Sequence, residues 1–245
     1  MFDHVTIRVS DLEASRRFFD LVFREVEFPD APTKGGHFVE WNDFSISQAS
    51  GERPVTRRLH VGFVAPSRAH VDRFWHTLTG AGYRDDGAPG PRPQYREDYY
   101  GAFVLDPDGN SMEAVHHSLV PKRTGVVDHL WLRVHDLAAA KRFYETIAPA
   151  AGFRLARELE DRAGFGGPAG SFTITTGEPT QNVHLAFPAA NRAAVDEFHR
   201  VATEAGYRDN GPPGERPVYH PGYYGAYVLD PDGNNVELVD HNRAA

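Results

Sequence analysis

The sequence contains no cysteine, which excludes disulfide bonds, thiolate metal ligands and a cysteine nucleophile. It also lacks an apolar run of transmembrane length and an apolar N-terminal leader, so no membrane role is expected and a cytoplasmic location is the default. Basic residues are few: 26 Lys and Arg stand against 34 Asp and Glu, for a net charge of −8, and they form no block. Because a nucleic-acid interface needs a basic face, nucleic acid is not an expected partner.

What the chain does contain is one long motif written twice. Residues 99–110 read YYGAFVLDPDGN and residues 223–234 read YYGAYVLDPDGN. A glutamate follows three residues after each copy, at Glu113 and Glu237, which are 124 positions apart. The sequence therefore predicts a tandem duplication into two domains of ordinary size.

Each half is predicted to divide again into two βαβββ modules. A strand with alternating apolar residues and then an apolar pattern of helical spacing begin each half, and a second strand–helix pair follows within it. The turn Asp-Pro-Asp-Gly joins the last two strands of each half. The predicted fold class is α+β, with curved mixed sheets and external helices. The predicted boundaries are a first domain over 1–118 (modules 1–56 and 57–118), a linker over 119–126, and a second domain over 127–245 (modules 127–181 and 182–245).

Two histidines and one glutamate recur at equivalent strand positions in both halves. They are His4, His60 and Glu113 in the first half, and His129, His184 and Glu237 in the second. Strand alternation places each of them on the face opposite its apolar neighbours. Two imidazoles and one carboxylate suit a divalent first-row metal and leave coordination positions open. The alternatives are isolated polar residues on a solvated sheet face, or metal-free relics of an ancestral site.

This pattern resembles the vicinal oxygen chelate superfamily, which includes glyoxalases, bleomycin-resistance proteins and extradiol dioxygenases. The resemblance rests on His-x₃-Arg-Val-x-Asp-Leu at 4–12 and 129–137, and on Asp-Pro-Asp-Gly-x₃-Glu at 106–113 and 230–237. It covers nearly the whole chain. It implies that two modules form one cup around a divalent Fe, Mn, Zn, Ni or Co ion. It also implies a small organic substrate that chelates the metal.

The resemblance also bears on the reaction. Glyoxalase I enzymes take a fourth ligand, usually Glu, from the last strand of the first module, but here that strand reads DFSIS at 43–47 and SFTIT at 171–175. The chain is therefore read as more similar to extradiol dioxygenases, in which a His and a Tyr near the ligand Glu contact substrate or oxygen. His220 and Tyr227 match those positions. The first half has Arg96 and Phe103 instead, so the second half is the predicted working site.

Three further residues are expected to bind substrate in the second half: Arg133, Trp131 and Tyr224. A structural salt bridge is an equal reading for Arg133, and a plain surface histidine is an equal reading for His220. Two functional hypotheses follow. One is a metal-dependent enzyme, either a dioxygenase-like oxidoreductase or a glyoxalase-like lyase. The other is a binding protein that sequesters a natural product without catalysis. A homodimer is compatible with both.

Overall fold

The computed structural model describes residues 1–28, 30–118, 125–168 and 170–242. Residues 119–124 of the predicted linker lie outside the described residues. The chain divides into two compact units: unit 1 consists of Met1–Val5 and Leu132–Ala245, and unit 2 of Thr6–Trp131. Among the described residues, no helix is long and apolar enough to span a membrane.

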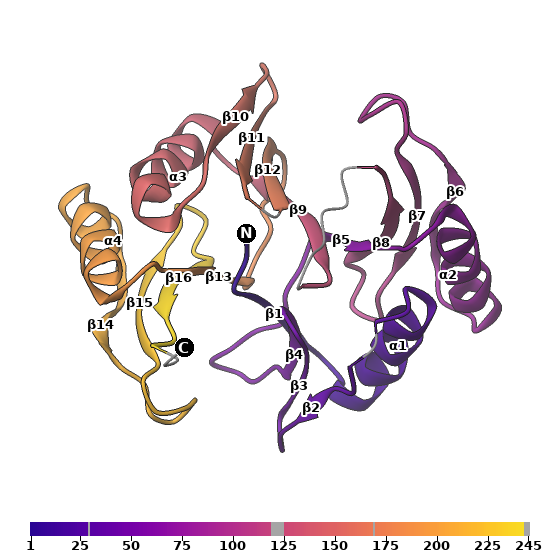
Figure 1. Cartoon of the computed structure of the whole chain (residues 1–245), viewed down its shortest axis with the longest axis horizontal. Coiled ribbons are helices and arrows are strands. Elements are labelled where there is room, and N and C mark those ends of the chain that lie inside the picture. Colours follow the sequence, from indigo (N-terminus) through magenta and orange to yellow (C-terminus); the bar gives the residue numbers. More distant parts are fainter. Residues whose placement is uncertain (29, 119–124, 169, 243–245) are drawn as a thin grey trace. The chain divides into compact units, whose positions relative to one another are not determined.

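The predicted α+β class and the four βαβββ modules are confirmed (Figure 1). The elements of the first half are β1 (His4–Val9), α1 (Leu12–Glu25), β2 (Thr33–Lys34), β3 (Phe38–Trp41), β4 (Phe44–Gln48), β5 (Leu59–Val64), α2 (Arg68–Gly80), β6 (Asp85–Pro91), β7 (Tyr100–Leu105) and β8 (Ser111–His116). Those of the second half are β9 (Val127–Val134), α3 (Leu137–Ala151), β10 (Arg154–Glu158), β11 (Arg162–Gly167), β12 (Gly170–Thr176), β13 (His184–Pro188), α4 (Arg192–Glu204), β14 (Asp209–Glu215), β15 (Tyr224–Leu229) and β16 (Asn235–Asp240).

In unit 1 the strands run in the order β14-β15-β16-β13. Strand β13 is parallel to β16, with Ala186 opposite Glu237, and β15 is antiparallel to β16, with Tyr227 opposite Glu237. The sheet is therefore mixed. Helix α4 packs on β14, β15 and β16, and α3 packs on α4 and on β10 to β12. The aromatic rings of Tyr144 and Phe172 fill this layer, with their centroids 4.8 Å apart.

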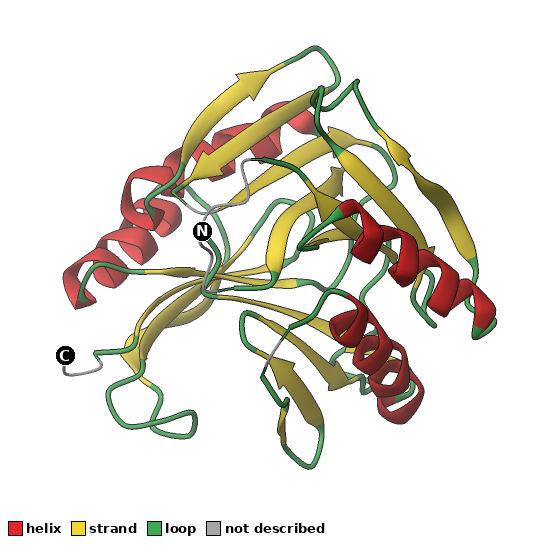
Figure 2. Cartoon of the chain, turned by 45° about the vertical axis from the view of Figure 1, so that its right-hand side comes forward, coloured by secondary structure: helices red, strands yellow, loops and turns green. Residues whose placement is uncertain are grey.

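Unit 2 repeats this arrangement with the strand order β5-β8-β7-β6. Gly62 of β5 lies opposite Glu113 of the parallel strand β8, and Phe103 of the antiparallel strand β7 lies opposite the same glutamate. Helix α2 packs on β6, β7, β8 and α1. Phe44 and Phe63 form part of the core, with ring centroids 5.1 Å apart. Within each unit the helices cover one face of the strands (Figure 2).

Local sequence explains why the helices start where they do. Asp11 caps α1 by accepting a hydrogen bond from the backbone N–H of Ala14. Asp136 does the same at the start of α3 with Ala139, and Asn191 at the start of α4 with Ala194.

Candidate metal centres

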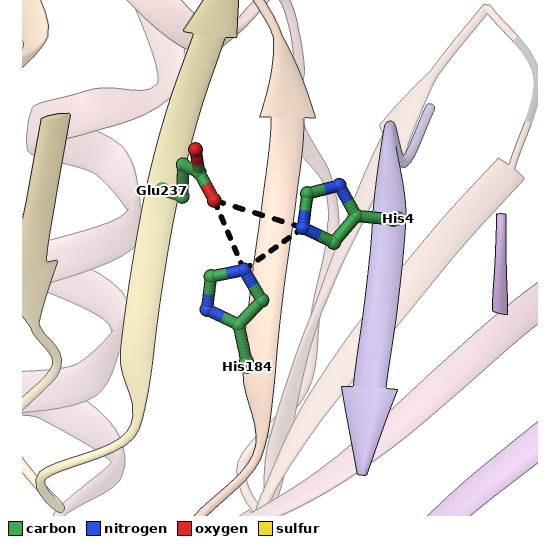
Figure 3. Close-up of side chains that lie close together, drawn as sticks. All are labelled: His4, His184 and Glu237. Carbon is green, nitrogen blue, oxygen red and sulfur yellow. Dashed lines mark hydrogen bonds and ion pairs between the residues drawn. The ribbon is translucent and has the colours of Figure 1, made fainter. Parts of the chain in front are cut away.

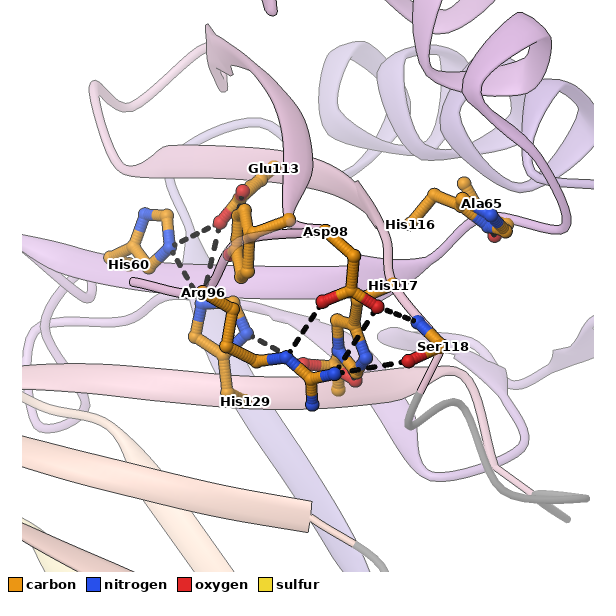
Figure 4. Close-up of polar contacts among 11 residues, drawn as sticks. His60, Ala65, Arg96, Asp98, Glu113, His116, His117, Ser118 and His129 are labelled. Atoms are coloured by element: carbon orange, nitrogen blue, oxygen red, sulfur yellow. Dashed lines mark hydrogen bonds and ion pairs between the residues drawn. The ribbon is translucent and has the colours of Figure 1, made fainter. Parts of the chain in front are cut away.

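The six predicted ligands form two clusters, but not the two that were predicted. Cluster 1 consists of His4, His184 and Glu237 and lies in unit 1 (Figure 3). Cluster 2 consists of His60, Glu113 and His129 and lies in unit 2 (Figure 4). The prediction that each half supplies all three residues of its own site is therefore wrong. The two halves exchange the histidine of their first strand.

The exchange has a visible physical cause at each first strand. In unit 1 the buried side chain of Phe2 packs against Phe187, with ring centroids 5.7 Å apart, and the Asp3 N–H donates to the Ala186 carbonyl. These contacts hold His4 beside β13. In unit 2 the buried carboxylate of Asp43 accepts from the N–H groups of Val126 and Val127, which hold the start of β9.

Cluster 1 brings three donor atoms together from β1, β13 and β16. His184 Nε2 lies 3.0 Å from His4 Nε2 and 3.0 Å from Glu237 Oε2, and His4 Nε2 lies 3.6 Å from the same oxygen. A metal with bonds of about 2.1 Å separates its ligand atoms by roughly 3.0 Å at octahedral angles and roughly 3.4 Å at tetrahedral angles. The donor set therefore fits a single divalent ion.

Cluster 2 is the same donor set in a more even triangle. The distances are 3.1 Å from His60 Nε2 to Glu113 Oε2, 3.2 Å between the two Nε2 atoms, and 3.3 Å from His129 Nε2 to Glu113 Oε2. Neither cluster includes a fourth His, Asp or Glu among the described residues. Each therefore leaves room for exogenous ligands on a bound ion.

The carboxylate of each cluster is buried, with only 1% of the side chain exposed. Burial raises the pKa of Glu113, but its contacts with His129 and His60 outweigh burial and hold that pKa below its ordinary value. The pKa of Glu237 is lowered in the same way, by His184, His4 and Tyr223 acting against burial. Each cluster thus contains a buried anionic oxygen that faces imidazole nitrogens, the environment in which a cation is stabilised.

The first-strand histidines are held by a carboxylate that the sequence analysis missed. His4 Nδ1 lies 2.8 Å from Asp3 Oδ1, and His129 Nδ1 lies 2.8 Å from Asp128 Oδ2. Because a carboxylate only accepts, each imidazole donates its Nδ1–H, and in the neutral form of the ring its Nε2 lone pair is directed at the cluster. The signal was the repeated Asp-His dipeptide at the start of both strands.

A second histidine holds each of these carboxylates. His241 Nε2 lies 2.8 Å from Asp3 Oδ2, and His117 Nε2 lies 3.2 Å from Asp128 Oδ1. The two His–Asp–His chains are equivalent by the repeat. They differ at the outer end, where the half-buried His220 places its Nε2 2.8 Å from His241 Nδ1 in unit 1.

In unit 2 the position of His220 is taken by Arg96, which turns away from the His117–Asp128–His129 series. Its guanidinium donates to Asp98 and to the Ser118 hydroxyl (Figure 4). Among the described residues, only unit 1 therefore carries a series of contacts from His220 through His241 and Asp3 to a cluster histidine. The His220 ring also lies against that of Tyr223, whose hydroxyl donates to Glu237.

The glutamates have a hydroxyl partner that sequence reasoning also missed. Tyr223 donates to Glu237 Oε1 over 2.6 Å, and Tyr99 donates to Glu113 Oε1 over 2.8 Å. The next residue, Tyr224, was predicted to bind substrate, and that stays a prediction. The Tyr224 hydroxyl donates to Asp196 of α4, on the helix-covered side. The repeated Tyr-Tyr pair was the signal for both residues.

The other predicted residues lie as follows. Tyr227 pairs with Glu237 across the strands, and its ring centroid lies 6.3 Å from that of His184. Burial and the charge of Glu237 raise the pKa of Tyr227, so its hydroxyl is a proton donor at neutral pH. Trp131 lies in unit 2, on the strand of His129, with its ring 6.0 Å from Tyr95. It therefore belongs with cluster 2 and not with the site of His184.

Arg133 is exposed at the end of β9. Its backbone N–H donates to the Thr180 hydroxyl, and its side chain lies over Gly177. Within the described part of the chain, no contact of its side chain with cluster 1 defines a role there, so substrate binding by Arg133 stays a prediction.

Comparison with known proteins places this chain in a family. The family model of the glyoxalase/bleomycin resistance protein/dioxygenase superfamily matches residues 1–114 and 126–238. The chain therefore belongs to that superfamily, as the sequence motifs indicated.

Two relatives are similar in sequence. The chain is 29% identical to lactoylglutathione lyase GLX1 of Arabidopsis thaliana over 169 residues, which is 65% of this chain and 57% of that protein. The match thus spans little more than half of that relative's length. Over 123 residues, 46% of this chain and 95% of the other, it is 31% identical to the uncharacterized protein YqjT of Bacillus subtilis.

The fold is shared with a solved enzyme. Glyoxalase I from Zea mays superposes with a TM-score of 0.69 at 18% identity, covering 98% of this chain and 92% of the other. This likeness shows a common fold.

Proposed function

We propose that this chain is a metal-dependent enzyme that acts on a small organic substrate, with a glyoxalase-like lyase reaction as the favoured class. The observation that carries the proposal is the convergence of two imidazoles and one buried carboxylate in each unit, at separations that suit one divalent ion. The metal site and the small-molecule substrate fit the superfamily, and the relative named as a lactoylglutathione lyase supports the reaction class.

The three residues of each cluster would act together as metal ligands. His4, His184 and Glu237 would hold the ion in unit 1, and His60, Glu113 and His129 would hold it in unit 2. When bound, such an ion supplies a Lewis acid that binds adjacent substrate oxygens and stabilises negative charge on them.

The surrounding residues prepare the ligands and handle protons. Asp3 keeps the Nε2 lone pair of His4 directed at the cluster, and Tyr223 occupies Glu237 Oε1 so that Oε2 is the oxygen that faces the histidines. Tyr227 presents a protonated hydroxyl on the same strand face as Glu237. The half-buried His220 contacts His241 at the outer end of this series and is placed to exchange protons with it.

A dioxygenase-like reaction is the second candidate, and one specific observation favours it. Cluster 1 has three ligands and a neighbouring Tyr227, whereas Phe103 occupies that position beside cluster 2. A three-ligand facial site is the arrangement of many Fe(II) oxygenases. The cytoplasmic location and the homodimer stay predictions.

One experiment separates these functions. The untagged chain is loaded with Fe(II), Mn(II), Ni(II), Co(II) or Zn(II) and assayed for S-lactoylglutathione formation from a 2-oxoaldehyde and glutathione, and for O₂ uptake with catechols. The proposal expects the lyase reaction, its loss in a chelator, and its loss in the double variant Glu113→Gln/Glu237→Gln. O₂ uptake without lyase activity would establish the second candidate. Metal-independent ligand binding with no turnover would establish sequestration and refute both.

A further inference from the structure

The two clusters differ in what holds the histidine from the second module of each half. In cluster 2, His60 Nδ1 lies 3.0 Å from the Ser111 hydroxyl, which itself donates to Asp86 Oδ2 over 2.7 Å. The hydroxyl hydrogen is directed at a carboxylate that can only accept, so Ser111 Oγ accepts the Nδ1–H of His60. This arrangement selects the His60 tautomer whose Nε2 lone pair faces the cluster. The outermost partner, Asp86, carries a negative charge.

In cluster 1 the equivalent positions carry two amides. The side-chain nitrogen of Asn235 contacts His184 Nδ1, and the Asn235 oxygen accepts from Asn210 over 2.9 Å. An amide N–H that donates to Nδ1 leaves the proton of a neutral imidazole on Nε2, the atom that faces Glu237. In this orientation of the amide, a neutral His184 carries its proton on Nε2, and metal binding through Nε2 requires the amide to turn over. The partners of His184 in this series, Asn235 and Asn210, carry no charge in either orientation of their amides.

A second, independent difference lies under the first-strand histidine. The His129 ring packs directly over Gly62, where any Cβ would overlap its atoms. The equivalent residue in unit 1 is Ala186, which lies opposite Glu237 and packs with Tyr223 and Val239. Only 9% of the His129 side chain is exposed, against 22% for His4. The first-strand histidine of cluster 2 is therefore the more enclosed of the two, whereas the second-module histidines differ in the opposite sense, with 19% of His60 and 14% of His184 exposed.

We propose that the two centres are unequal: cluster 2 binds a divalent metal ion more tightly than cluster 1, and Ser111 and Asp86 are the positioning residues that make the difference. The inference rests on the proposed metal-dependent function. Partners outside the ligand set typically change metal affinity 10- to 100-fold. Because Asp86 is exposed to solvent, the lower end applies, and the expected difference is about tenfold.

The test uses Co(II) as the probe, titrated into the metal-free full chain and followed by its visible absorption and by calorimetry. His184→Ala leaves cluster 2 as the remaining centre, and His60→Ala leaves cluster 1. We expect the chain with His184→Ala to bind Co(II) with a Kd about tenfold lower than the chain with His60→Ala. Equal values within twofold, or the reverse order, would overturn the proposal.

The positioning role is tested by exchanging the partners. In the His184→Ala chain, Asp86→Asn is expected to raise the Kd for Co(II) about tenfold. Asp85→Asn is the matched control, since it removes the same charge at the neighbouring residue. The Asp85 carboxylate accepts from Trp75 and from the Gly87 N–H. An equal effect of the two substitutions would show that Asp86 acts by general charge, contrary to the proposal.

The reciprocal exchange guards against misfolding. In the His60→Ala chain, the double substitution Asn210→Asp/Asn235→Ser is expected to lower the Kd for Co(II) about tenfold, a gain that a damaged fold does not produce. An unchanged or higher Kd would overturn the proposal. Failure of the parent chain to bind Co(II) at either centre would refute the proposed function itself, whereas binding at equal affinity would refute this inference alone.

Discussion

The substitution Gly62→Ala is a sharp test of the cluster geometry, because it adds one methyl group at a known place. The new Cβ would lie 2.6 Å from His129 Nδ1 and 2.9 Å from His129 Nε2. Ordinary contacts between such atoms are about 3.5 Å or longer, so the ring must move by about 1 Å. The strand cannot yield easily, since Gly62 is paired in register with Glu113.

A ring displacement of that size would also break a hydrogen bond. The contact of 2.8 Å between His129 Nδ1 and Asp128 Oδ2 would lengthen beyond hydrogen-bond range. Overpacking typically costs about 1–3 kcal/mol, and leaving a buried polar partner unpaired costs about 1–3 kcal/mol. We therefore expect the free energy of unfolding to fall by about 2–4 kcal/mol in the metal-free chain, together with loss of the metal ion from cluster 2.

The assay is urea unfolding of the metal-free chain together with metal content after dialysis against Zn(II). The matched control is Ala186→Gly, which removes a methyl group at the equivalent position of unit 1 and is expected to leave both metal ions in place. Gly62→Ala protein that unfolds like the parent and holds two ions per chain would show that His129 does not depend on this contact, and would refute the reasoning.

Three other outcomes are expected, two from the contacts of cluster 1 and one from metal binding at either centre. His241→Ala is expected to raise the Kd for Co(II) at cluster 1 about 10- to 100-fold, and His241→Gln, which keeps a donor to Asp3, to restore most of that affinity; equal losses would exclude the hydrogen bond as the cause. Tyr227→Phe is expected to lower kcat at least tenfold in the chain with His60→Ala without changing its metal content, and unchanged kcat would remove Tyr227 from the mechanism. Metal at 100 times its Kd is expected to raise the unfolding free energy by about 2.7 kcal/mol per occupied centre, measured by thermal unfolding with and without chelator, and equal stability in both would contradict specific binding to the folded chain.

The residues of the candidate centres could be predicted from the sequence because strand alternation is a strong constraint. The apolar residues directly before and after His60 and Glu113 in their strands are buried in the core. The side chains of His60 and Glu113 must therefore lie on the other face. The repeat then marked them as a set. The family followed from the same residues and from the turn before Glu113.

The grouping of those residues could not be predicted, because a duplication makes the two pairings equivalent. His4 and His129 occupy the same place in their modules, and either histidine completes either cluster by pattern alone. Long-range contacts decide the matter, above all the packing of Phe2 on Phe187 in unit 1 and the hydrogen bonds from Val126 to Asp43 in unit 2. Such contacts carry no periodic signal.

Residues that act from outside the regular strands were also beyond the pattern. Tyr223 stands one residue before β15 begins, so alternation within the strand assigns no face to the side chain that contacts Glu237. His241 follows the end of β16 and reaches Asp3 from there. Their roles depend on where the chain turns after a strand, which the alternation of apolar residues does not specify.

The exchange of first-strand histidines is tested most directly by counting bound metal ions in two double variants. Zn(II) is measured per chain, after dialysis, in His4→Ala/His184→Ala and in His4→Ala/His60→Ala. The structure assigns His4 and His184 to one centre, so the first variant should retain one ion and the second none. One ion in the second variant and none in the first would mean that each half builds its own centre, contrary to the arrangement described above.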